Sequence, residues 1–199
     1  MPGAAQPLGR RERNKQEKLE RITAAASELF AAHGVDDVTT QQIAEAADIG
    51  TGTLFLYART KGELLLLVQN TNYAAALKRG RAAATKAKDA LDAVLALVTP
   101  VVESNRAQID NGRTYLREMV FGDPTEPHHA EALSIVAQTE EALAGTLTER
   151  AGAAEADAAA LARVISAVMF VEMAATVNAG SSVKDILAGI RTQVAAILR

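Results

Sequence analysis

The chain has 199 residues, 49% hydrophobic and 23% charged, which is enough apolar content for one large or two small domains with a buried core. The lack of cysteine excludes disulfides and thiolate metal sites, and the net charge of −3 argues against a generally basic nucleic-acid coat. Because the chain is rich in Ala and Leu, we expect an all-α protein. Its most apolar run is interrupted by Glu172, so we expect no membrane span and a cytoplasmic protein.

The N-terminal segment carries a cluster of basic residues that includes Arg10 and Arg11. We expect residues 1–13 to form a flexible basic arm that reaches DNA phosphates, and the alternative is a solvated tail without a partner. A helix is predicted from about Asn14–His33, where apolar residues recur at helical spacing. Gly34 is predicted to end this helix as a left-handed cap.

Two short helices with polar starts are predicted next. The first covers about Thr40–Ala47, with Thr39 as its N-cap and Gln42 completing a capping box, whose capping bond contributes ~1 kcal/mol. The second covers about Thr51–Tyr57 and is entered through a cluster of glycine and hydroxyl residues. Two short helices joined by a tight turn are typical of a helix-turn-helix, in which the second helix enters the DNA major groove.

Longer helices are predicted for the rest of the chain. Thr60 and Glu63 form a second predicted capping box, which starts a helix that extends toward Arg79. Pro100 is expected to kink or split the helix that contains it. The later helices, which bring the total to about nine, are predicted at about 86–107, 108–121, 127–151, 155–179 and 182–198.

A fixed pattern of residues extends from the end of the first predicted helix to the start of the fourth. It consists of Phe30, Gly34, Thr39, Ile43-Ala44, Gly52-Thr53-Leu54-Phe55, Tyr57, Lys61 and Leu64. This pattern resembles the DNA-binding domain of the TetR family of transcriptional regulators over about residues 14–65. The resemblance implies a helix-turn-helix domain at 14–62 and a helical effector-binding and dimerisation domain at 63–199. Asp48 stands where the family's turn usually has Gly, and Asp tolerates left-handed dihedrals better than most residues.

The resemblance also implies which residues contact DNA. Hydroxyl and ammonium groups donate to phosphates, and those at matching positions or at the start of the first short helix are Thr39, Thr40, Thr53, Tyr57 and Lys61. The positions near base edges are Gln41, Thr51, Gly52, Phe55 and Leu56. Gln reads adenine while Thr, Phe and Leu pack on a thymine methyl, so we expect A·T pairs in the site. The alternative for each single residue is a role in capping or in the core.

A candidate effector pocket is marked by large, adaptable side chains in the second half of the chain, namely Tyr73, Tyr115, Met119, Met169 and Met173. Such residues also fill cores. Glu172 lies among them in the sequence and is proposed as a polar ligand contact or a dimer-interface residue, the alternative being an exposed helix edge. His128 and His129 lack spaced partners, so we expect surface loop histidines and no metal, no cofactor and no enzymatic activity.

The last two predicted helices are rich in Ala, which suits close helix packing. In the TetR family these helices pair with their twins, so the resemblance implies a homodimer on double-stranded DNA with a near-palindromic operator. The leading hypothesis is a repressor released by a small-molecule effector that shifts the helix starting near Thr60, although the sequence leaves activation open. The alternatives are a DNA-binding adaptor without an effector and a helical enzyme whose N-terminal region is incidental.

Overall fold

The computed structural model describes residues 9–198, which are helical apart from short turns and loops. Nine α-helices and one 3-10 helix make up this part of the chain, which confirms the predicted all-α fold. In chain order they are α1 (Arg10–His33), α2 (Thr40–Ala46), α3 (Thr51–Leu54), α4 (Lys61–Ala84), α5 (Ala90–Arg106), α6 (Ile109–Phe121), α7 (Pro127–Ala151), α8 (Glu155–Ala174), η1 (Thr176–Asn178) and α9 (Val183–Ile197).

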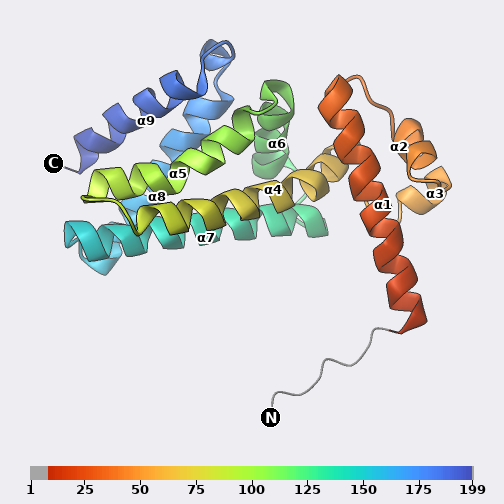
Figure 1. Cartoon of the computed structure of the whole chain (residues 1–199), viewed down its shortest axis with the longest axis horizontal. Helices are drawn as coiled ribbons and strands as arrows, with labels where there is room; N and C mark the ends of the chain where they lie inside the picture. Colours follow the sequence, from red (N-terminus) through yellow and green to blue (C-terminus); the bar gives the residue numbers. More distant parts are fainter. Residues whose placement is uncertain (1–8, 199) are drawn as a thin grey trace.

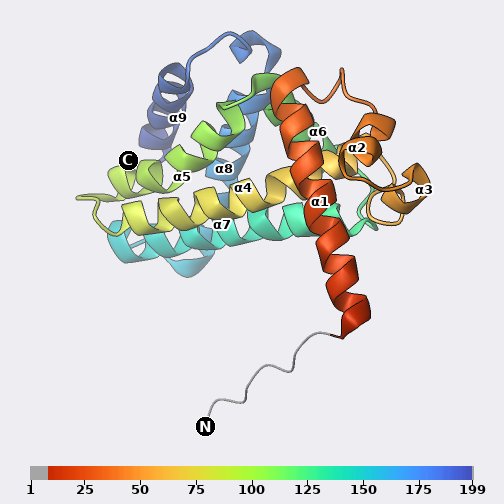
Figure 2. The ribbon, with the colours of Figure 1, turned by 45° about the vertical axis from the view of Figure 1, so that its right-hand side comes forward.

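The helices form two regions, which we call the head (α1–α3 and the following turn, residues 10–58) and the body (α4–α9). Figures 1 and 2 show α1, α2 and α3 gathered at one end of the molecule, with α4 leading from them into the body. Within the body, α4 packs against α5, α6 and α7, and α9 packs against α5 and α8. With α1–α3 at one end, the head projects from the body.

None of the described helices is long and apolar enough to cross a membrane.

The head has a small apolar core built from all three of its helices. Phe30 of α1, Ile43 of α2 and Leu54 of α3 are almost completely inaccessible to solvent. Ala58, just after α3, is also buried, so a small side chain closes this core next to α4. Apolar burial of this kind holds short helices that would be marginal in isolation.

The two predicted capping boxes differ in the structure. At α2 the box is complete, because the Thr39 hydroxyl accepts from the Gln42 N–H and the Gln42 side chain accepts from the Thr39 N–H. At α4 only half of the prediction is correct: the Thr60 hydroxyl accepts from the Glu63 N–H, but the Glu63 carboxylate accepts from the Arg59 N–H at 2.7 Å. The carboxylate thus satisfies a backbone donor one residue earlier than expected.

The boundary predicted for the first helix is wrong at its N-terminal end. The helix begins at Arg10 instead of Asn14, so residues 10–13 are helical and do not belong to a flexible arm. The Arg13 N–H donates to the Gly9 carbonyl at 3.0 Å, and this run of arginine and glutamate has good helix propensity. Residues 1–8 of the predicted arm lie outside the described residues.

Other helix ends also differ from the prediction. The helix α3 is a single turn that ends at Leu54, because the next N–H groups, of Leu56 and Tyr57, bond three residues back in a tightened turn. The helix α5 continues through Pro100, so the expected split is absent there. Burial of the α5 face that packs on α4 outweighs the missing proline donor. The helix α8 ends at Ala174, and η1 follows.

Two positive φ angles bear on the predicted turns. Asp48 has φ 52°, which confirms that aspartate adopts the left-handed conformation in the turn before α3. Gly34 also has a positive φ of 80°, but its ψ of 156° lies outside the left-handed helical region that we predicted. That combination is open to glycine because it has no Cβ.

Candidate nucleic-acid interface and effector cavity

The tip of the head exposes two large apolar side chains. Phe55 is 44% exposed and Leu56 is 83% exposed, whereas Leu54 and Ala58 on either side are buried. Glycine and hydroxyl residues precede this turn on α3. Exposed apolar groups gathered beside polar donors are typical of an interaction surface.

The other predicted DNA-contact residues lie around this tip and remain accessible. Thr39, Gln41 and Gly52 are exposed. The remaining residues are half-buried, and they are Thr40, Thr51, Thr53, Tyr57 and Lys61. The structure thus brings these residues of α2, α3 and the start of α4 to one end of the molecule and buries none of them completely.

Hydrogen bonds orient several of these side chains. The Tyr57 hydroxyl donates to the Lys15 carbonyl at 3.4 Å, and the Lys61 ammonium donates to the Asp36 carbonyl at 2.9 Å. An ammonium has three donors, so Lys61 keeps two for another acceptor. The Thr39 hydroxyl donates to Gln42 Oε1 at 2.9 Å as part of the capping box. Its role in the head is therefore mainly to cap α2.

An ion pair that the sequence analysis missed braces the helix-turn-helix. Arg21 of α1 lies 3.4 Å from the Asp48 carboxylate, and its guanidinium also contacts the Asp48 carbonyl. Both side chains are exposed, so the pair contributes at most about 1 kcal/mol. The main effect of this ion pair is to hold the left-handed turn at Asp48 in position against α1.

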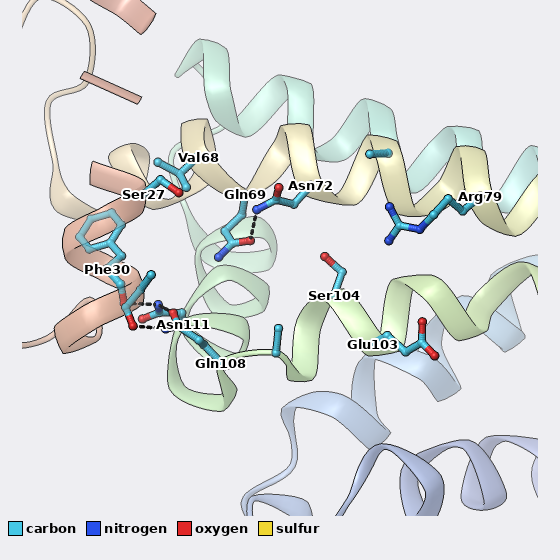
Figure 3. Close-up of a pocket in the computed structure, with 13 residues that line it drawn as sticks. Ser27, Phe30, Val68, Gln69, Asn72, Arg79, Glu103, Ser104, Gln108 and Asn111 are labelled. Atoms are coloured by element: carbon cyan, nitrogen blue, oxygen red, sulfur yellow. Dashed lines mark hydrogen bonds between the residues drawn. The ribbon is translucent and has the colours of Figure 1, made fainter. Parts of the chain in front are cut away.

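One junction between head and body is formed by the start of α6. Asn111 is only 1% exposed; its Oδ1 accepts from the Val35 N–H at 2.7 Å, and its amide donates to the Phe30 carbonyl at 2.9 Å. The Gln108 amide donates to the Ala31 carbonyl beside it. Figure 3 shows both side chains next to the end of α1. These contacts join residues about eighty positions apart, so no local pattern in the sequence indicates them.

The second junction is formed by the start of α7. His128 Nε2 lies 3.0 Å from the Tyr57 carbonyl, and the Arg59 guanidinium lies 3.0 Å from the Glu126 carboxylate. His129 is buried, and neither of its ring nitrogens has a hydrogen-bond partner among the described residues. The prediction of surface loop histidines is therefore wrong, because Pro127 starts α7 and places both histidines in its first turn, where His128 contacts the head and His129 is buried.

A buried carboxyl group lies at the same junction. Glu63 is 6% exposed, and burial, together with a hydrogen bond to the Glu126 side chain, raises its pKa to about 7. The Arg59 N–H opposes this rise. The raised pKa means that the Glu63 carboxyl keeps its proton to a higher pH than an ordinary glutamate does.

The body contains an apolar cavity of about 70 Å³ lined by α4, α5, α6, α7 and α8. Five of the predicted pocket residues line it, namely Tyr73, Tyr115, Met119, Met169 and Met173. The rings of Tyr73 and Tyr115 stack with centroids 4.3 Å apart. Burial raises the pKa of both phenols, which therefore stay protonated and serve only as hydrogen-bonding groups.

The predicted residue Glu172 lies outside the cavity wall. Its carboxylate accepts from Asn178 Nδ2 at 2.9 Å and from Gln193 Nε2 at 2.6 Å. Glu172 therefore ties the end of α8 to η1 and α9. The ligand contact suggested for it has no support from this position, since the helix turns its neighbours Met169 and Met173 toward the cavity instead.

Comparisons with known proteins agree with this architecture. Residues 22–68 match the family model described as "Bacterial regulatory proteins, tetR family". The fold resembles FadR of Thermus thermophilus, a TetR-family transcriptional repressor in complex with lauroyl-CoA (TM-score 0.71, 21% identity, 90% of this chain and 92% of that chain). It also resembles a TetR transcriptional regulator from Rhodococcus sp. RHA1 (0.69, 16%, 92% and 96%) and the fatty acid degradation regulator FadR from Bacillus halodurans (0.63, 15%, 90% and 99%). No curated protein matches.

The match and the fold cover complementary parts of the molecule. The family model spans the head from residue 22 onward and the first third of α4, where the motif residues lie. The similar structures extend over nine-tenths of the chain and include the body. The helix-turn-helix region therefore matches the TetR family model, and the fold of the chain is that of TetR-family transcriptional regulators.

Proposed function

We propose that the protein is a DNA-binding repressor that a small-molecule effector releases from a near-palindromic operator. The observation that carries this proposal is the exposed tip of the head, where Phe55 and Leu56 stand beside the hydroxyls of α3, clear of the body. An exposed apolar pair costs solubility unless a partner covers it, and thymine methyl groups are suitable partners in the major groove.

The roles within the interface follow from the chemistry of each group. Thr40, Thr53, Tyr57 and Lys61 position the head by donating to phosphates, while Thr39 holds the start of α2. Gln41, Thr51, Gly52, Phe55 and Leu56 lie near base edges. The basic residues at the start of α1 are exposed on a helix, from which they add a favourable potential for the phosphate backbone.

A homodimer through α8 and α9 would place two heads on successive major grooves. Val164 and Val171 are exposed on α8, although this helix also contributes to the body's core. Exposed apolar side chains on such a helix favour its pairing with a second copy of the chain. Glu172 would support that pairing indirectly, since it holds α9 against α8.

The effector would act through the junctions between body and head. The helix α6 carries Tyr115 and Met119 in the cavity wall and Asn111 at the head. A ligand that widens the cavity moves α6 and, through Asn111, the end of α1. The sequence suggested α4 as the route, and the contacts of α6 and α7 add two further ones. A coupling free energy of about 1–3 kcal/mol is typical of such pairs of sites.

A DNA-binding adaptor without an effector is the second candidate. The observation in its favour is the cavity volume of about 70 Å³, because ligand pockets usually hold roughly 300–1,000 Å³. A thermal-shift experiment separates the two hypotheses, since an effector at saturation raises the melting temperature. Lauroyl-CoA, the ligand of the Thermus thermophilus FadR complex, is the first probe.

The experiment that tests DNA binding is a titration of DNA from upstream of the protein's own gene with wild-type protein and Lys61→Ala. We expect the variant to bind all DNA sequences more weakly and to lower the salt slope by about one. Lys78→Ala, on the exposed face of α4 in the body, is the control and should bind like wild type. Equal affinity and salt slope for Lys61→Ala and wild type would contradict the phosphate contact.

A further inference from the structure

The wall of the cavity described above, which we call the inner cavity, is mostly apolar, and three of its four polar side chains make a hydrogen bond. Tyr73 accepts from Asn105 Nδ2 at 2.6 Å, Tyr115 donates to Asn70 Oδ1 at 3.0 Å, and Thr139 donates to the carbonyl four residues before it at 2.8 Å. Its remaining polar side chain is Ser166. A charged or strongly polar group would lose its hydration there without replacement. The part of a ligand that enters the inner cavity is therefore hydrocarbon.

A second hollow lies on the other side of Phe170, between α6 and α8, and we call it the outer groove. It has a volume of about 550 Å³, and Phe170 contributes to the walls of both spaces. Arg113 and Arg117 line the outer groove together with the exposed ring of Phe121. Phe170 is thus shared by an apolar space and a space whose walls include two arginines.

The charges of the outer groove are arranged along α6. Asp110 belongs to its first turn, and Asp36 of the head lines the same groove. Arg117 follows seven residues after Asp110, which is about 10 Å further along the helix axis. Arg113 is held in place, since it donates to the Ala174 carbonyl at 3.2 Å and to Thr176 at 3.1 Å. Both acidic and cationic side chains therefore line the outer groove, and the arginines belong to the later turns of α6.

Arg117 is the more available of the two cations. Its side chain is 64% exposed, and its ionic contact is with the adjacent Glu118 at 3.4 Å. Such a pair between exposed neighbours is weak, so the guanidinium can exchange it for another anion. A guanidinium binds carboxylate or phosphate oxygens with two parallel hydrogen bonds.

We infer that the effector is an amphipathic anion, with a hydrocarbon chain in the inner cavity and an acidic head group at Arg117 in the outer groove. Phe170 is the partition that the chain passes. This inference rests on the proposed function, because it names the class of ligand that the body takes. It excludes small hydrophilic effectors such as sugars and free amino acids from the inner cavity.

The inner cavity is so small that a ligand chain can bind only if the helices around it move. A volume of about 70 Å³ cannot hold a chain of ten carbons, so the wall must yield. Met119, Met169 and Met173 line it, and methionine adapts its shape at low cost. Because Met119 lies on α6, the space that the chain needs displaces the helix that carries Asn111 to the head.

Calorimetric titration of the full chain with decanoate and with 1-decanol tests the inference. The two probes share a chain and differ in charge. We expect both to bind, and the affinity for the carboxylates from octanoate to decanoate to rise roughly fourfold per methylene. In Arg117→Glu the affinity for decanoate should fall about tenfold, while that for 1-decanol changes less than twofold. Arg79→Glu, on α4 in the separate groove of Figure 3, is the matched control and should leave both affinities unchanged.

Ser166→Phe tests the site of the chain, because the ring would fill the inner cavity from a half-buried position on α8. It should abolish binding of both probes while the circular dichroism melt stays cooperative. Equal responses of the two probes to Arg117→Glu, or binding that survives Ser166→Phe in the folded variant, would overturn the inference. So would the failure of both probes to bind wild type. The DNA titration is independent of these probes. If the protein binds DNA but neither probe, the proposed DNA-binding function is retained and the proposed class of ligand is rejected.

Discussion

The head and the body differ in how far apart in the sequence their functional residues lie. In the head, caps, turn residues and the exposed tip lie within about thirty consecutive residues, and each has a local physical reason. In the body, the inner cavity and both junctions depend on side chains that meet only after the helices have packed. The candidate site in the head therefore depends on a local sequence motif, whereas the candidate site in the body depends on the packing of distant segments. Changes in the two regions should have different consequences.

The largest effect is expected from close packing in the body. A Cβ on Gly80 of α4 would lie 2.1 Å from the Leu97 carbonyl oxygen of α5, and backbone atoms cannot rotate away. Gly80→Ala should lower the free energy of unfolding by about 3 kcal/mol or more, as measured by urea denaturation. Gly145→Ala, where a Cβ on α7 meets open space, should instead stabilise by up to about 1 kcal/mol. Equal effects would mean that α4 and α5 are not this close.

The next effect concerns the contact of the body with the head. Asn111→Ala leaves the buried Val35 N–H without its partner and removes one of the two donors to the Phe30 carbonyl, which should cost about 1–3 kcal/mol. Hydrogen exchange should rise first at the end of α1. Asn72→Ala, which removes only an exposed contact with Gln69, is the control. If exchange at the end of α1 matched wild type, Asn111 would not connect the two regions.

A pH-dependent effect is expected from Glu63, which lies near Glu126 where the starts of α4 and α7 meet. The folded pKa of Glu63 is about 7 against an ordinary 4.5, so the folded state binds more protons than the unfolded state between these values. The free energy of unfolding should therefore fall as pH rises from about 4.5 to 7, by roughly 1–3 kcal/mol from this group. Glu63→Gln should remove the fall, and Glu103→Gln, on an exposed face of α5, should keep it. Chemical denaturation at several pH values measures both.

The smallest effect is local to the head. Thr39→Ala removes the hydroxyl that accepts from the Gln42 N–H and should cost about 1 kcal/mol. Ser182→Ala removes the equivalent group of the capping box at α9 and should cost a similar amount in the body. Only the first change should weaken DNA binding. Equal losses of DNA affinity would mean that the cap at Thr39 has no special place in the interface.

The sequence predicted the head well because its signals are local. The capping box of Thr39 and Gln42, the positive φ of Asp48 and the buried Leu54 follow from short-range chemistry. The start of α1 was placed too late because charged residues suggested an arm, although Arg and Glu are also good helix formers. Whether the residues at the tip bind DNA stays a prediction.

The body was less predictable because its contacts join distant segments. The large side chains of the inner cavity could be guessed from their type, but Glu172 could not be distinguished from them by its position in the sequence. Asn111 and His128 gave no signal at all, since their partners lie in the head. Tertiary packing decides such roles, and local patterns do not encode it.

The central claim is that the tip of the head is the surface that contacts DNA. Photo-crosslinking tests it most directly, with benzoylphenylalanine placed at Leu56 or, as the control, at Leu133, an exposed apolar position on α7 in the body. We expect upstream DNA to be crosslinked from position 56 and not from position 133. Crosslinks from the body alone, or equal yields from both positions, would contradict it.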